Sequence, residues 1–199
     1  MLDNAIISYG FCFPNNKYNS VKFRVMCEEG SRSKESEEMG EVRLKKNKLS
    51  IALINSVRKA TIKRYTGRNK EKLLDDQPVD CELEIYILSL CCNLLKEYYL
   101  QRFKTSVKDD RKLLEDKTLS GRQQFAIVHR LEAKETVITN MKLIELLIQI
   151  LSKVSDGQDF RAAYQSKIEM LEDDANYNRN RRAIRRYLRS FHYYSQKKH

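Results

Sequence analysis

The chain has 199 residues, of which 41% are hydrophobic, and its formal net charge is +11. This length and hydrophobic content suffice for one compact domain with a core, which excludes fibrous and wholly disordered proteins. Only six glycines and two prolines are present, so few positions carry turn chemistry and a mostly α-helical chain is predicted.

The first predicted element is a pair of strands within residues 5–25. Residues 21–25 alternate apolar and basic side chains, the period of two that is typical of a half-buried strand. A turn is predicted just before them, where residues 14–17 read Pro-Asn-Asn-Lys. Two strands alone are marginal in water, so this hairpin needs further structure to pack against.

Residues 28–48 are densely charged and contain few apolar side chains, which predicts a flexible loop. Beyond this loop the apolar residues recur with helical spacing. Two pairs, Ser106 with Asp109 and Ser120 with Gln123, have the spacing of capping boxes and place the starts of two helices. Helices are predicted over residues 49–65, 81–103, 106–116, 120–156, 158–172 and 179–195.

Catalytic and metal-binding side chains are not grouped in the sequence. The five cysteines form no C-x-x-C pair, which indicates reduced, buried thiols and a cytosolic or nuclear protein. A structural role is predicted for His129, and a solvated helix face for the acidic residues Asp109, Asp110, Glu115 and Asp116. No metal site and no catalytic set are therefore predicted. No membrane contact is predicted either, because the longest apolar run, residues 143–151, is too short to span a bilayer.

The C-terminal residues 176–199 carry eight Lys or Arg and no acid, so much of the basic charge belongs to this tail. In one interpretation its arginines neutralise phosphates while its aromatic side chains stack on unpaired bases. In the other, the aromatics pack on the bundle and the arginines are solvated; a nuclear-localisation segment at residues 179–186 is a third interpretation. The candidate nucleic-acid contacts are Arg181, Arg182, Arg185, Arg186 and Arg189, and the interleaved aromatics are Tyr187, Phe191, Tyr193 and Tyr194.

Two stretches, "DNAIISYGFCFPNN" at residues 3–16 and a longer one at residues 98–138, contain recognisable motifs. The first is similar to the end of the SET domain in SET-type protein-lysine methyltransferases of the Rubisco large-subunit methyltransferase kind, where N-x-E-L-x-x-x-Y-G-F recurs. "YYLQRFKTSVKDDRKLLEDKTLSGRQQFAIVHRLEAKETVI" resembles the helical substrate-binding domain, with a "DD..LL" segment and an R-x-G-E-K-x-I type signature. That signature begins here at Arg130, and Glu-Ala-Lys stands in place of the usual Gly-Glu-Lys.

The resemblance implies a lysine-access channel lined by Tyr9 with Phe11 packed beside it, although both can equally be core aromatics of a strand. It also implies S-adenosylmethionine as the cofactor of an intact family member. The sequence lacks the cofactor loop, the Asn-His motif and the catalytic tyrosine segment, so no cofactor is expected for this chain alone. Methyl transfer needs the sulfonium and the lysine held in line, which one channel wall cannot achieve.

The sequence thus predicts a mainly α protein: a helical bundle preceded by a short β-hairpin remnant of a SET domain. The predicted organisation is residues 1–27 as this remnant, 28–48 as a loop, 49–175 as the substrate-binding-like bundle and 176–199 as a basic amphipathic helix. The predicted function is the substrate-binding portion of a protein-lysine N-methyltransferase, inactive by itself and acting on a protein substrate. The sequence leaves open whether this chain is a fragment, a split gene product or the product of a gene model that starts late. The alternative is a basic helical module that binds nucleic acid or protein.

Overall fold

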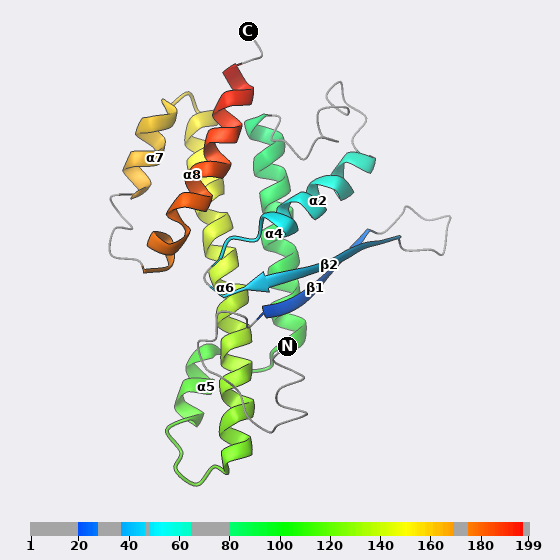
Figure 1. Cartoon of the computed structure of the whole chain (residues 1–199), viewed down its shortest axis with the longest axis vertical. Coiled ribbons are helices and arrows are strands. Elements are labelled where there is room, and N and C mark those ends of the chain that lie inside the picture. Colours follow the sequence, from blue (N-terminus) through cyan, green and yellow to red (C-terminus); the bar gives the residue numbers. More distant parts are fainter. Residues whose placement is uncertain (1–19, 28–36, 47, 65–79, 169–174, 197–199) are drawn as a thin grey trace.

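The computed structural model describes residues 20–27, 37–46, 48–64, 80–168 and 175–196. Within these ranges a two-stranded antiparallel sheet is followed by helices (Figure 1), so the predicted mainly helical class is confirmed. The elements in chain order are β1 (Ser20–Cys27), β2 (Glu37–Lys45), α2 (Ile51–Arg64), α4 (Cys81–Arg102), α5 (Val107–Leu113), α6 (Gly121–Ser155), α7 (Phe160–Ile168) and α8 (Ala175–Gln196).

Helix α6 is the longest element, and its 35 residues span about 50 Å. Its predicted start is confirmed: the Gln123 N–H donates to the Ser120 hydroxyl at 3.4 Å, and the Ser120 N–H donates to the Gln123 side chain at 2.8 Å. The helix ends before Gly157, whose φ of 87° is a left-handed conformation that glycine adopts without a steric penalty.

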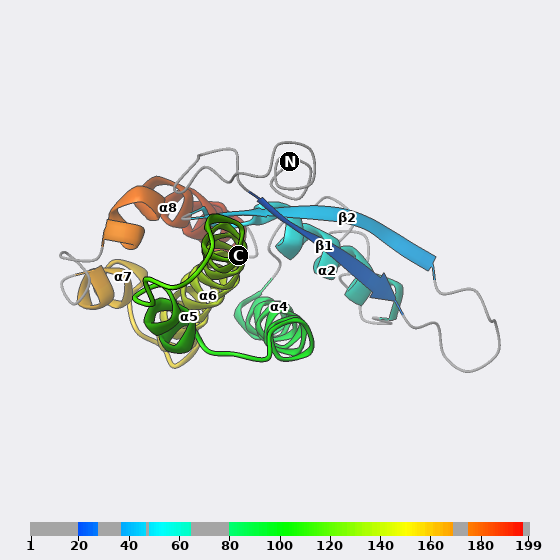
Figure 2. The ribbon, with the colours of Figure 1, turned by 90° about the horizontal axis from the view of Figure 1, so that it is seen from below.

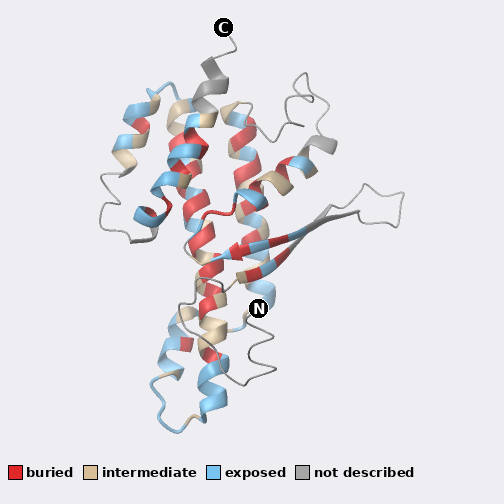
Figure 3. Cartoon of the chain, in the orientation of Figure 1, coloured by how far each residue is buried: buried red, intermediate tan, exposed pale blue. Residues whose placement is uncertain are grey.

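The other elements are arranged around α4 and α6, which lie side by side in Figures 1 and 2. Helix α2 and the sheet lie on one side of this pair, whereas α7 and α8 pack against α6. Buried residues concentrate along the middle of α6, along α4 and on the sheet, while α5 and the first turns of α6 are largely exposed (Figure 3). The core therefore lies among the sheet, α2, α4, α8 and the middle of α6, and α5 with the start of α6 projects from it (Figure 3).

The strand pairing differs from the sequence prediction. Strand β1 pairs with β2, so the prediction of a flexible loop over residues 28–48 is wrong for residues 37–45. Val42 and Leu44 are buried while Glu41 and Arg43 are exposed, which is the alternation of a half-buried strand. The sequence prediction missed this alternation because the strand is rich in charged residues, such as Glu41 and Arg43, which lie on its outer face. Residues 5–19, which held the predicted first strand and turn, lie outside the described residues.

The inner face of the hairpin belongs to the core of the helical bundle. Phe23 packs edge-on against Tyr98 of α4, with 5.3 Å between the ring centroids. The inward residues of both strands are in one continuous buried cluster with residues of α2, α4 and α6. The prediction that residues 1–27 form a unit separate from the bundle is therefore wrong for Ser20–Cys27, because this strand completes the helical core.

The connection from β2 to α2 is fixed by two buried asparagines. The Leu49 N–H donates to Asn180 Oδ1 of α8 at 2.8 Å, and the Ser50 N–H donates to Asn140 Oδ1 of α6 at 3.1 Å. Asn140 also donates to the carbonyl of Lys45 at 3.3 Å. Buried backbone groups need partners, and here α6 and α8 supply them, so the hairpin is oriented by distant parts of the chain.

Substitution of Leu44 by alanine tests this assignment of the hairpin. Leu44 is fully buried, so the free energy of unfolding should fall by about 2–5 kcal/mol, the usual cost of a cavity in a core. Urea denaturation followed by circular dichroism measures it. Leu100→Ala is the matched control, because Leu100 is 62% exposed and should cost under about 0.5 kcal/mol. Equal, small effects of both substitutions would show that the hairpin is not part of the helical core.

Candidate functional site

A buried ionic cluster joins α5 to α6. The Asp110 carboxylate accepts hydrogen bonds from Arg130 Nη2 at 2.7 Å, from Lys134 Nζ at 2.6 Å and from the Thr105 hydroxyl at 2.8 Å. Lys134 also donates to the Thr105 hydroxyl at 2.7 Å and to the Ser106 carbonyl at 3.2 Å. The side chains of Asp110 and Lys134 are fully buried, so each charge depends on the other for its stability.

The cluster brings together two motifs of the second stretch that carries the family resemblance, residues 98–138. The "DD..LL" segment contains Asp110 and also Asp109, which forms a capping box with Ser106. Arg130 and Lys134 belong to the signature on α6, where a spacing of four residues places both on one face of the helix. The predicted solvated acidic face is correct for Asp109 but wrong for Asp110, which points into the junction of α5 and α6.

The Asp110 carboxyl has a lowered pKa of about 2. Burial alone would raise this pKa, but hydrogen bonds from Arg130, Lys134 and Thr105 outweigh it. Because the folded pKa lies below the ordinary value of 3.8, the carboxylate stabilises the fold above about pH 4, and this contribution is lost as the pH falls toward 2.

The urea midpoint should therefore drop steeply between about pH 4 and pH 2. Asp110→Asn should show a shallower dependence in that interval, because the titrating group is gone. Equal slopes for the two proteins would show that Asp110 is not the group responsible.

A surface network extends the cluster toward the sheet. Glu135 of α6 accepts from Arg111 Nη2 of α5 at 2.9 Å and lies 2.9 Å from Lys46 Nζ at the end of β2. Burial would raise the pKa of Glu135, but these two cations lower it below its usual value. Helix α5 is thus held to α6 from the outside as well as from within.

A second buried cluster joins three helices. Glu84 of α4 accepts hydrogen bonds from Arg58 of α2 and from the Tyr187 hydroxyl of α8, and Arg58 also donates to Asn55 Oδ1 at 2.7 Å. Arg58 and Glu84 are each 1% exposed. Burial, followed by the neighbouring Glu84 charge, raises the pKa of Tyr187 well above its ordinary value, so this hydroxyl remains a donor. The burial of Glu84 with Arg58 and Tyr187 was not predicted from the sequence.

The structure bears in two ways on the candidate nucleic-acid contacts of α8. All five candidate arginines are exposed, but Tyr187 is buried against Glu84, so of the two interpretations the one in which this ring packs on the bundle is correct for Tyr187. Tyr177 is likewise 3% exposed. The buried positions of α8 that the structure describes therefore support the interpretation of an amphipathic helix packed on the bundle. The side chains of Phe191, Tyr193 and Tyr194 lie outside the described residues, as do Tyr9 and Phe11.

Exposed apolar side chains lie on α4, α5 and α6. Tyr86 and Leu100 of α4 are 54% and 62% exposed, and Phe125 of α6 is 36% exposed. Leu113, in the last turn of α5, is 41% exposed. Leu100 lies near the end of α4, Leu113 in the last turn of α5 and Phe125 near the start of α6. Figure 1 shows α5 and the start of α6 below the end of α4. Such residues can anchor a protein partner.

The start of α4 borders a depression of about 530 Å³. In the described part of the chain its lining residues are Asp80, Cys81, Glu82, Leu83 and Tyr86. The Asp80 side chain accepts the Leu83 N–H at 2.8 Å and so caps α4.

In the described part of the chain, no group of three His, Cys, Asp or Glu side chains is placed to hold a metal ion. No helix in the same ranges combines the length and the apolar character needed to cross a bilayer.

Comparison with known proteins identifies the domain. The family model described as Rubisco LSMT substrate-binding matches residues 20–137, whereas a search of curated proteins found no match. The matched region contains both strands, helices α2, α4 and α5, and the first half of α6 with the whole Asp110 cluster. It covers more than half of the 199 residues. The chain therefore belongs to the Rubisco large-subunit methyltransferase substrate-binding family.

Proposed function

We propose that this chain is the substrate-binding part of an S-adenosylmethionine-dependent protein-lysine N-methyltransferase of the SET type, and that it does not transfer methyl groups by itself. The observation that carries this proposal is the family match over residues 20–137. The Asp110 cluster supports it, because it fixes the projecting end of the domain through residues of two motifs within the stretch 98–138 that resembles the family.

The proposed binding surface is the exposed end formed by the end of α4, α5 and the start of α6. Its apolar anchors are Leu100, Leu113 and Phe125, surrounded by charged side chains. Because α5 is tied to α6 by Asp110 inside and by Glu135 outside, little freedom is lost when a partner binds. The domain would hold a folded protein so that one of its lysines reaches a catalytic centre built from other SET segments.

The absence of catalysis is proposed from the chemistry of the reaction. Methyl transfer requires a narrow channel that aligns the sulfonium methyl with a neutral lysine amine. The sequence contains no Asn-His motif of the kind that holds the adenosyl cofactor in the family it resembles. A labelled-methyl assay with the purified chain and a mixture of proteins should therefore give no incorporation, and incorporation would refute this part of the proposal.

A domain-transfer experiment tests the binding role. The catalytic part of an active SET-type lysine methyltransferase is joined in front of the full 199-residue chain, and methylated proteins are compared with those of the catalytic part alone. We expect the fusion to methylate a distinct set of proteins. An unchanged set would contradict the proposed function.

Surface substitutions in this fusion identify the contact region. Replacing Leu100, Leu113 and Phe125 together with serine should reduce methylation of the new targets at least about tenfold, because loss of apolar anchors commonly costs more than 1 kcal/mol each. The control replaces Lys142, Glu145 and Gln149, three exposed residues in the middle of α6, with serine. Equal losses in the two variants would contradict this choice of surface.

The proposed cellular location is the cytosol or the nucleus. Cys81, Cys91 and Cys92 are free thiols, and burial is the main factor that raises the pKa of each. Such thiols are usual in reducing compartments.

A further inference from the structure

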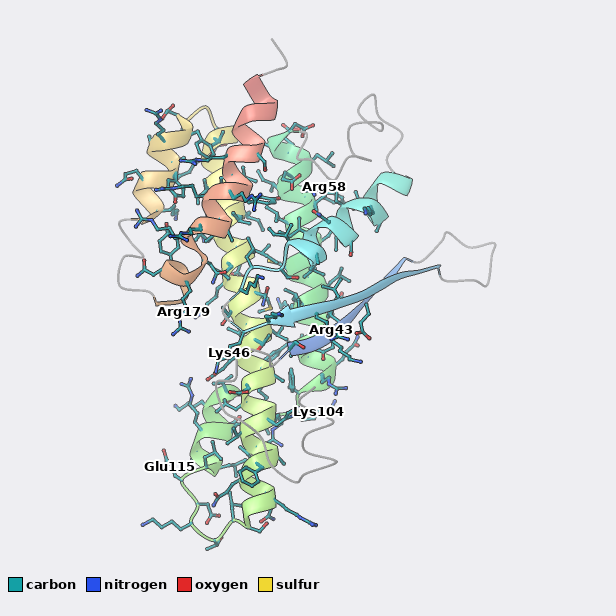
Figure 4. The ribbon with its side chains drawn as sticks, viewed as in Figure 1. Arg43, Lys46, Arg58, Lys104, Glu115 and Arg179 are labelled. Carbon is teal, nitrogen blue, oxygen red and sulfur yellow. The ribbon has the colours of Figure 1, made fainter. Side chains whose placement is uncertain are left out.

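The outer face of α8 carries six exposed arginines (Figure 4 labels the first, Arg179). No acidic residue occurs anywhere in the sequence of this helix. Among the residues that the structure describes, none of the six arginines forms an ion pair with a carboxylate, whereas the exposed Arg43 and Arg111 pair with Glu41 and Glu135. The six are Arg179, Arg181, Arg182, Arg185, Arg186 and Arg189.

The opposite face holds α8 firmly on the bundle. Ile184 and Leu188 are fully buried, the Tyr187 hydroxyl donates to Glu84, and Asn180 accepts the Leu49 N–H at 2.8 Å. Arg185 also lies over the Tyr164 ring of α7, 5.8 Å from its centroid. The arginine face is therefore presented on a fixed support, which lowers the entropy that a partner must lose on binding.

The spacing of these arginines suits carboxylates on an extended chain. Arg181, Arg185 and Arg189 follow one another at intervals of four residues, so successive Cα atoms are separated by about 6 Å along the helix. Alternate residues of an extended strand lie on the same side and are about 6.6 Å apart. Arginine also binds carboxylate in a planar, two-bond geometry that is stronger than a single neutral hydrogen bond.

We propose that the outer face of α8 binds an extended acidic segment of the protein partner, in which Asp or Glu recurs at alternate positions. This inference rests on the proposed function, since it adds a charged docking site to a protein-binding domain. A single-stranded nucleic acid is the less favoured ligand, because Tyr177 and Tyr187 face inward and offer no ring for base stacking.

Fluorescence anisotropy tests the proposal with the full chain and a labelled peptide of alternating Glu and Ser. Arg181→Gln/Arg185→Gln/Arg189→Gln should weaken binding at least about tenfold, since three charge-assisted contacts are lost. Lys22→Gln/Lys59→Gln/Lys142→Gln is the matched control, because it removes three exposed cations outside α8 and outside the proposed surface around α5, and it should change affinity less than about twofold. Urea midpoints of both variants should equal that of the parent chain.

Several outcomes would overturn the proposal. Equal losses of peptide affinity in the arginine variant and the lysine variant would show that net charge alone attracts the peptide. An unchanged affinity in the arginine variant would show that the peptide does not bind to α8. A duplex or single-stranded oligonucleotide that binds more tightly than the peptide at the same salt, and depends on the same arginines, would assign the face to nucleic acid. If the peptide binds through α8 but the fusion enzyme selects no new targets, the proposed function fails and the α8 site stands. If the fusion enzyme selects new targets but the peptide does not bind through α8, only the α8 site fails.

Discussion

Replacement of Asp110 by asparagine is expected to lower the free energy of unfolding by about 3–5 kcal/mol. The substitution preserves volume but leaves Lys134, which is fully buried, without its counter-charge. A loss of this size is a large share of the roughly 5–15 kcal/mol that stabilises a typical domain. Urea denaturation at neutral pH measures the loss.

The control for this prediction is Glu115→Gln. Glu115 is exposed and lies two residues beyond α5, so its neutralisation should change stability by less than about 0.5 kcal/mol. Combining Asp110→Asn with Lys134→Met should cost less than the sum of the single substitutions, because the two side chains act as one ion pair. Additive effects would show that the pair contributes no coupling energy to the fold.

Substitution of Glu84 by alanine in the parent chain is expected to lower the free energy of unfolding by about 3–5 kcal/mol. It removes the carboxylate from Arg58, which is 1% exposed, and the acceptor from the Tyr187 hydroxyl. Thermal or urea unfolding of the purified variant measures the loss. Glu82→Ala is the control, because Glu82 is exposed in the same helical turn and should cost no more than about 1 kcal/mol.

An apolar replacement of the whole cluster separates burial of charge from packing. In Arg58→Met/Glu84→Leu/Tyr187→Phe no buried charge or hydroxyl is left without a partner, so most of the stability lost in Glu84→Ala should return. A triple variant that is less stable than Glu84→Ala would mean that the hydrogen bonds among the three side chains, and not relief of an unpaired charge, dominate this site.

Local signals in the sequence predicted most of the helices. The capping boxes at Ser106 and Ser120 placed the starts of α5 and α6, because a serine and its partner three residues later interact within one turn. The amphipathic character predicted for the C-terminal helix is confirmed at Ile184 and Leu188, which are fully buried while the arginines are exposed. These features depend on neighbours a few residues apart, and a single sequence contains that information.

Features that depend on distant partners were missed. The pairing of β1 with β2 crosses a gap between Cys27 and Glu37, and the charges of β2 concealed its two buried residues. Nothing local distinguishes Asp110, which is buried, from Asp109, which is exposed. For Glu84 a signal existed: it shares a helix face with the buried Leu88, Cys91 and Leu95, and an acid in such a stripe requires a buried cation.

Native-state hydrogen exchange tests the central claim most directly, namely that the hairpin and the helices form one protein-binding domain. The account predicts that the most protected amides of β1 and β2 exchange with the same opening free energy as those in the middle of α6, because Phe23 and Leu44 share the core of the helices. If instead the strand amides exchange at much lower opening free energy and independently of α6, the hairpin is a separate unit and the claim is wrong.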